Sequence, residues 1–142
     1  MQRHIAKELK DFELSISKAI CIKHPFKDRS LNATQIRIIG YLLRNQNRDV
    51  CQKELEQEMN LKKASITGSL DSLEEKGLIV RKTSDEDKRK KFVILTDEIL
   101  DKKKEIENRI NKVDEKITKG ISDEELETFF AILDKIKKNL EK

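Results

Sequence analysis

The chain has 142 residues and a net charge of +4; charged residues make up 41% of it and apolar residues 36%, a low share for a stable single core. No stretch approaches the roughly 20 apolar residues of a membrane-spanning helix, and the N-terminus lacks the apolar segment of a secretory signal. The only cysteines, Cys21 and Cys51, match no secreted disulfide pattern. We therefore expect a cytoplasmic protein with free thiols and no membrane partner, built as one domain over residues 1–142.

Apolar residues at steps of three or four predict a first helix over residues 3–22, which Pro25 ends. Asn32 followed by Gln35 is typical of a capping box and predicts a second helix that runs to about residue 44. Gly40 in the middle of that helix costs roughly 1 kcal/mol relative to alanine. We expect the close approach of another backbone to compensate for it.

A polar turn at residues 45–49 leads to Cys51, the expected N-cap of a short third helix. A fourth helix is predicted over residues 61–76, with Gly77 as its left-handed stop. Its buried stripe, at steps of four and three, consists of Ile66, Leu70 and Leu73.

Two short strands are predicted next, at residues 79–83 and 91–95, joined by a charged tip at residues 84–90. Helix, helix and hairpin in this order are typical of a winged helix-turn-helix, which lays a helix in the DNA major groove. Residues 62–91 hold nine Lys/Arg against six Asp/Glu, whereas residues 97–142 hold eleven against thirteen. The basic excess favours a polyanion partner; the alternative is a lysine-rich surface without one.

The C-terminal part predicts a long helix from Thr96 to about Gly120 and a last helix that starts at the capping box of residues 122–125. A coiled-coil-like seam on the long helix consists of Ile99, Ile106, Ile110, Val113 and Ile117. The terminal helices have apolar stripes but no sheet to cover. We therefore expect a mainly α fold with a small β-hairpin, in which residues 1–30 and 97–142 form a homodimer interface around a two-fold axis.

Several short segments follow one another in a specific order between residues 31 and 96. They are Leu31 with Gln35, Lys53-Glu54-Leu55, the run from Leu61 to Thr67, Leu73-Glu74 with Lys76 to Ile79 and Arg81, Asp87-Lys88-Arg89, and Leu95-Thr96. In this order and spacing, residues 31–96 resemble the MarR family of winged-helix regulators. The resemblance implies a homodimer that binds a pseudo-palindromic operator in double-stranded DNA, usually as a repressor that a small ligand or an oxidant releases.

Two positions depart from the family pattern. Many relatives carry arginines on the fourth helix where this chain has Gly68 and Ser72, and arginine is the commonest donor to guanine edges. This chain is therefore expected to depend on other polar groups of the helix, on the wing and on DNA shape. Cys51 replaces the usual Ser/Thr cap, which weakens that helix start.

The candidate DNA-binding residues lie on the fourth helix away from its core stripe, on the first strand and at the wing tip. They are Lys62, Lys63, Ser65, Thr67, Ser69, Arg81, Asp87, Lys88, Arg89, Lys90 and Lys91. We expect Arg89 to enter the minor groove, and Asp87 resembles the family acid that holds the wing arginine. The alternative is a solvated helix start and an ordinary charged turn.

A candidate effector pocket, suggested by the resemblance, would be lined by Phe12, Ile16, Phe26, Ile38 and Tyr41, although apolar residues at such positions also simply form cores. Cys21 and Cys51 are candidate redox sensors, or else small buried hydrophobes. Cys21 and His24 have a metal-like spacing, but the chain offers no second cluster, so we expect no metal and no cofactor. The competing function is a helical protein-interaction module; nothing indicates an enzyme.

Overall fold

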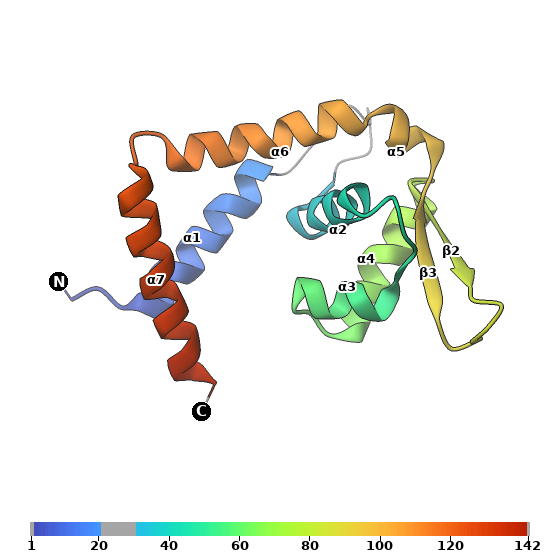
Figure 1. Ribbon diagram of the computed structural model, residues 1–142, viewed down its shortest axis with the longest axis horizontal. Helices are drawn as coiled ribbons and strands as arrows, with labels where there is room; N and C mark the ends of the chain where they lie inside the picture. Colours follow the sequence, from blue (N-terminus) through green and yellow to red (C-terminus); the bar gives the residue numbers. More distant parts are fainter. Residues whose placement is uncertain (1, 21–30, 142) are drawn as a thin grey trace.

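The computed structural model describes residues 2–20 and 31–141. In chain order the elements are α1 Ile5–Ile20, α2 Ala33–Arg44, β1 Val50–Cys51, α3 Gln52–Met59, α4 Lys63–Glu75, β2 Ile79–Thr83, β3 Lys91–Leu95, α5 Asp97–Asp101, α6 Lys103–Thr118 and α7 Asp123–Leu140. Helices α2 to α5 and the sheet form a head at one end (Figure 1). Helix α6 leads away from the head to α7 at the other end, and α1 runs obliquely from its start beside α7 back towards α6 and α2. We call α1, α6 and α7 the arm.

The hydrophobic core lies in the head, between its helices and the small sheet. The predicted stripe of α4, Ile66, Leu70 and Leu73, is fully buried. The core also takes in apolar side chains of α2, α3 and the sheet and, from beyond the hairpin, Ile99 and Ile106. These side chains bury one face of α4, and the opposite face of the helix remains exposed to solvent.

Two of the predicted helix-end signals, at Asn32 and Gly77, are confirmed. Asn32 accepts from the Gln35 N–H, and the Gln35 side chain accepts from the Asn32 N–H, which completes the capping box of α2. Gly77 has φ +74°, and the bonds from Gly77 N–H to Glu74 and from Leu78 N–H to Leu73 end α4 in a Schellman motif.

The expectation at Gly40 is wrong in detail. A Cβ added there would meet the Arg44 Nη1 at 3.3 Å and the Ile110 Cδ1 at 3.4 Å. The close neighbours are therefore side chains, one of them from α6, and not another backbone. The missing Cβ lets α6 pack directly on α2.

The sheet has one strand more than the sequence predicts. Strand β1 is only Val50–Cys51, and it pairs antiparallel with β3 through Val50 opposite Val93 and Cys51 opposite Phe92. The strand order is β1-β3-β2. Two residues are too short to show the alternation by which a strand is recognised. Cys51 is the N-cap of α3 as predicted, but its side chain makes no capping hydrogen bond.

The single long helix predicted after Thr96 is wrong, because the chain breaks at Lys102, which has φ −103° and ψ 7°. The break lets α5 bury Ile99 in the head while α6 leaves along a different line. The seam does not continue as one buried stripe: Ile106 is fully buried, Ile110 and Val113 are half-buried, and Ile117 is 37% exposed.

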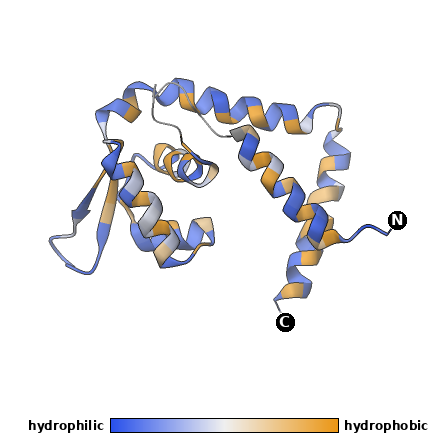
Figure 2. Ribbon diagram, turned by 180° about the vertical axis from the view of Figure 1, so that it is seen from behind, coloured by the Kyte–Doolittle hydropathy of each residue, from blue (hydrophilic) through white to orange (hydrophobic). Residues whose placement is uncertain are grey.

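Large apolar side chains stay exposed on the arm, and Figure 2 shows apolar residues along both α1 and α7. Ile5 is 62% exposed, Phe130 55% and Ile132 51%. Between α1 and α7 lies a cavity of about 360 Å³ lined mainly by apolar side chains. Within the described ranges, none of the helices has an apolar stretch long enough to cross a bilayer.

Candidate nucleic-acid interface

Two side-chain hydrogen bonds fix α4 against the other helices of the head. The Gln35 Nε2 donates to the Ser72 Oγ at 3.1 Å, and Gln35 is itself only 3% exposed. The Gln52 Nε2 donates to the Thr67 Oγ1 at 2.9 Å, which joins the start of α3 to α4. Since the first bond comes from α2 and the second from α3, the orientation of α4 is set from two sides.

A hollow of about 730 Å³ lies between α3, the start of α4 and the wing, the hairpin formed by β2, β3 and their tip. Its lining residues are Cys51, Gln52, Lys53, Glu56, Lys63, Thr67, Arg81, Asp87, Arg89, Lys90 and Lys91. Six of these side chains are cations and two are carboxylates. A concave surface with this excess of positive charge attracts a polyanion.

At the wing tip, Asp87 organises the backbone around Arg89. The Asp87 Oδ1 accepts from the Arg89 N–H at 3.0 Å and from its Nε at 3.3 Å. The Arg89 side chain is still 93% exposed, and the Ser84 Oγ accepts from the Asp87 N–H at 3.3 Å. The carboxylate therefore restrains the tip while the guanidinium remains outside the protein.

Arg81 is engaged within the protein. Its Nη2 lies 2.6 Å from the Asp71 Oδ1 and 2.9 Å from the Glu74 Oε1, and its N–H donates to the Glu74 Oε2 at 3.0 Å. The hydrogen bond to Glu74 raises the pKa of the Arg81 guanidinium, and the same bond lowers the pKa of the Glu74 carboxyl. Arg81 lines the hollow, but its charge is shared with α4.

The structure brings together most of the predicted DNA-binding residues, and four lie apart from the hollow. Lys62, Ser65 and Lys88 are exposed, and Ser69 is half-buried. Sequence reasoning missed Gln52, Lys53 and Glu56 as part of this surface. Lys53 belongs to a segment that carries the family resemblance, but apolar spacing alone cannot show that the first turn of α3 faces the wing.

Of the candidate effector residues that the structure describes, Tyr41 lines a cavity that Phe12, Ile16 and Ile38 do not line. Ile38 is fully buried and Phe12 is 42% exposed, while Ile16 is half-buried. Tyr41 lines a separate cavity of about 230 Å³ between α2, α3 and α6. Phe26 and Cys21 lie outside the described residues, and Cys51 is a half-buried free thiol. Within residues 2–20 and 31–141, no group of His, Cys, Asp or Glu is arranged to hold a metal ion.

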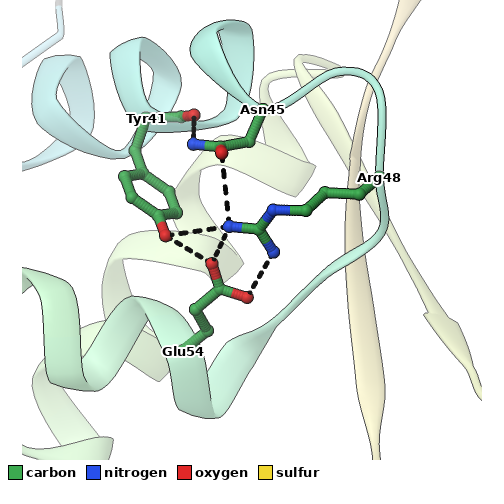
Figure 3. Close-up of polar contacts among 4 residues, drawn as sticks. All are labelled: Tyr41, Asn45, Arg48 and Glu54. Atoms are coloured by element: carbon green, nitrogen blue, oxygen red, sulfur yellow. Dashed lines mark hydrogen bonds and ion pairs between the residues drawn. The ribbon is translucent and has the colours of Figure 1, made fainter.

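A polar cluster that the sequence did not predict joins α2, the loop after it and α3 (Figure 3); we call Tyr41, Asn45, Arg48 and Glu54 the clamp. The Arg48 Nη1 donates to the Glu54 Oε1 at 2.8 Å, and its Nη2 pairs with the other carboxylate oxygen. The Arg48 Nη2 also donates to the Tyr41 hydroxyl at 3.1 Å and to the Asn45 Oδ1 at 3.2 Å.

Charge pairing shifts the titration of the clamp. The hydrogen bonds from Arg48 and then Tyr41 lower the pKa of Glu54 to about 2. The Tyr41 hydroxyl donates to Glu54, and this bond raises the pKa of the phenol. The Glu54 side chain is 27% exposed, so the pair is only partly screened by water.

The head is a winged helix-turn-helix, and comparison with known proteins places the chain within that class. A sequence model of the MarR family matches residues 30–90. The crystal structure of a transcription regulator MarR from Oenococcus oeni PSU-1 is 30% identical over 95% of this chain and 99% of that chain, with a TM-score of 0.77. The chain therefore belongs to the MarR family of winged-helix transcription regulators.

Two more distant structures share the fold. MepR of S. aureus, solved in a complex with DNA, is 20% identical over 98% of this chain and 99% of that chain, with a TM-score of 0.85. The PcaV transcriptional regulator of Streptomyces coelicolor, solved with its natural ligand, is 17% identical over 95% of this chain and 90% of that chain, with a TM-score of 0.76. The resemblance extends over the arm as well as the head.

Proposed function

We propose that this chain acts as a homodimeric repressor that binds a pseudo-palindromic operator and is released by a small ligand or an oxidant. The observation that carries the proposal is the hollow, in which six cations from α3, α4 and the wing face one concave surface. In this arrangement α4 enters a major groove and Arg89 reaches the neighbouring minor groove, where a narrow groove concentrates negative potential.

The exposed face of α4 bears on how the operator is read. Lys63 stands at the start of the helix, Ser65 is exposed, and Gly68 has open space around it. Because this face carries no arginine, we propose that the cations mainly bind phosphates and that sequence preference comes from the hydroxyl groups and from DNA shape.

The experiment selects duplexes of about 30 bp from a randomised library, long enough for two half-sites about 34 Å apart. Binding of the recovered duplex is then titrated at several salt concentrations. Arg89→Ala should weaken binding strongly and reduce the salt slope by about 1, since one positive charge is lost from the minor groove between the phosphate backbones. Lys104→Ala, which removes an exposed positive charge from α6, is the matched control. A wild-type protein that selects no duplex, or binds without salt dependence, supports the protein-interaction alternative.

The homodimer is supported by the apolar surface of the arm. Ile5 of α1 and Phe129 of α7 are 62% and 44% exposed, and both line the cavity between these helices. A second copy that covers α1 and α7 removes this surface from water, worth roughly 25 cal/mol per Å² of apolar area. The dimer also places two heads on one duplex, as two half-sites require.

Release by a small ligand is supported by the ligand-bound PcaV, which shares the fold. In this chain the cavity at Tyr41 lies between α2, α3 and α6, where the head meets the arm. A compound found by thermal shift to bind the wild-type protein should weaken DNA binding in the same titration. A compound that binds but leaves DNA affinity unchanged contradicts this part of the proposal.

A further inference from the structure

The clamp lies next to the DNA-facing surface without being part of it. Glu54 belongs to the first turn of α3, between Lys53, which lines the hollow, and Leu55, which is fully buried in the core. Arg48 comes from the loop between α2 and β1, and it is not among the residues that line the hollow. Within the clamp, Glu54 is the residue that connects Arg48 to this surface.

The ion pair has the geometry of a rigid connection. The two terminal nitrogens of Arg48, Nη1 and Nη2, donate to the two carboxylate oxygens of Glu54, and such bidentate pairs fix orientation as well as distance. The loop itself is held, because the Asn45 Nδ2 donates to the Tyr41 carbonyl oxygen at 2.8 Å and the Asn45 Oδ1 accepts from Arg48. Helix α2 is thus joined to the first turn of α3 by side chains on both sides of the loop.

The connection continues to α4. Gln52, two residues before Glu54, donates to Thr67 of α4 at 2.9 Å. A rotation of the first turn of α3 therefore changes both the position of Lys53 and the support of α4.

We propose that Arg48 is a positioning residue for DNA binding, an inference that rests on the proposed function. Its ion pair with Glu54 holds the first turn of α3 in the orientation that completes the hollow. Arg48 touches no phosphate in this role.

The positioning role predicts changes in DNA affinity, for substitutions of Glu54 and Arg48, that the change in net charge alone does not predict. Glu54→Gln removes a negative charge from a head that binds a polyanion, so charge alone raises DNA affinity. Loss of the clamp instead lowers it, by between about 2-fold and 30-fold for a network residue outside the contact. Arg48→Gln should cost a similar factor, while the slope of log affinity against log salt stays at the wild-type value.

The test is a double-mutant cycle of Arg48→Gln and Glu54→Gln, titrated with the selected duplex at several salt concentrations. The double variant should bind about as well as either single variant, because the same connection is lost in each. Arg37→Gln, which removes an exposed charge from α2 outside the clamp, is the matched control and should lack this coupling. Unfolding by urea in the same series shows the folded fraction of every variant.

Any one of three results overturns the proposal. The first is that folded clamp variants bind DNA as tightly as the wild type, and the second is that Glu54→Gln binds DNA more tightly than the wild type. The third is that Arg48→Gln lowers the salt slope by about 1 and keeps its full effect on affinity when Glu54 is also changed. The last result identifies Arg48 as a phosphate contact. If a single variant does not fold, Tyr41→Phe, which keeps the ring but loses both hydroxyl bonds, replaces it and should weaken binding by a smaller factor. A wild-type protein that binds no duplex refutes the proposed function itself, which distinguishes the two failures.

Discussion

The depressed pKa of Glu54 predicts a specific dependence of stability on pH. Its pKa falls from 4.5 to about 2 on folding, and one pKa unit corresponds to about 1.4 kcal/mol. The whole shift is therefore equivalent to about 3–4 kcal/mol. Because the Glu54 and Arg48 side chains are 27% and 44% exposed, water screens the pair, and we expect about 1–2 kcal/mol to remain.

The sign follows from linkage. A carboxyl whose folded pKa lies below its unfolded pKa stabilises the protein above the unfolded value, and the contribution is lost as pH falls through the folded value. Glu54 therefore stabilises the protein fully above about pH 5, and the contribution disappears between pH 4.5 and about 2. Glu54→Gln keeps the shape of the side chain but cannot titrate, so it should lack this part of the acid sensitivity.

The assay is urea unfolding of the wild type and Glu54→Gln at a series of pH values and at one protein concentration, which cancels the effect of association on the difference. The wild type should be more stable by about 1–2 kcal/mol at pH 7, and the two curves should converge near pH 2. Glu74, whose pKa is also lowered, titrates in both proteins and drops out of the comparison. A difference that stays constant from pH 7 to pH 2 refutes the assigned role of the ion pair.

Three further predictions concern helix ends, packing and assembly. Gly68→Ala should raise the free energy of unfolding by up to about 1 kcal/mol because a Cβ meets nothing within 4 Å, whereas Gly77→Ala should lower it by about 1 kcal/mol because φ is +74°; urea unfolding of the pair should show opposite signs. Ser72→Ala leaves the buried Gln35 amide without its acceptor, which should cost about 1–3 kcal/mol by thermal or urea unfolding. Phe130→Glu, at a side chain 55% exposed on α7, should shift sedimentation from dimer to monomer while leaving helix content intact; an unchanged sedimentation coefficient contradicts the α1–α7 interface.

The sequence predicts best those features that neighbouring residues determine. The capping box at Asn32, the stripe that buries Leu70 and the left-handed Gly77 each depend on side chains within a few positions, and each is confirmed. Strand β1 was not predicted because its two residues form a strand only through pairing with β3. The break at Lys102 was not predicted because the apolar spacing continues through it, and Ile99 before the break and Ile106 after it are both fully buried.

The candidate site follows the same division. The basic tip and the free face of α4 are visible in the sequence, and the structure brings Lys63 and Arg89 to one hollow. Lys53 lines the hollow because of the orientation of α3, and apolar spacing does not determine that orientation. The clamp joins side chains as far apart as Tyr41 and Glu54, 13 positions along the chain, and no local pattern reports such a contact.

Arg81 shows why charge alone is a poor guide to which residues bind DNA. The sequence places it with the other cations of the wing, yet its guanidinium is held by Asp71 and Glu74. The hydrogen bond from its N–H to Glu74 and the one from the Thr96 hydroxyl to the Gly77 carbonyl oxygen at 2.8 Å also fix the root of the wing against α4. In the proposed complex, a wing held in this way loses little conformational freedom on binding the minor groove, so more of its contact energy remains as affinity. We therefore expect Arg81 to support the proposed DNA binding by keeping the wing and α4 at a fixed separation.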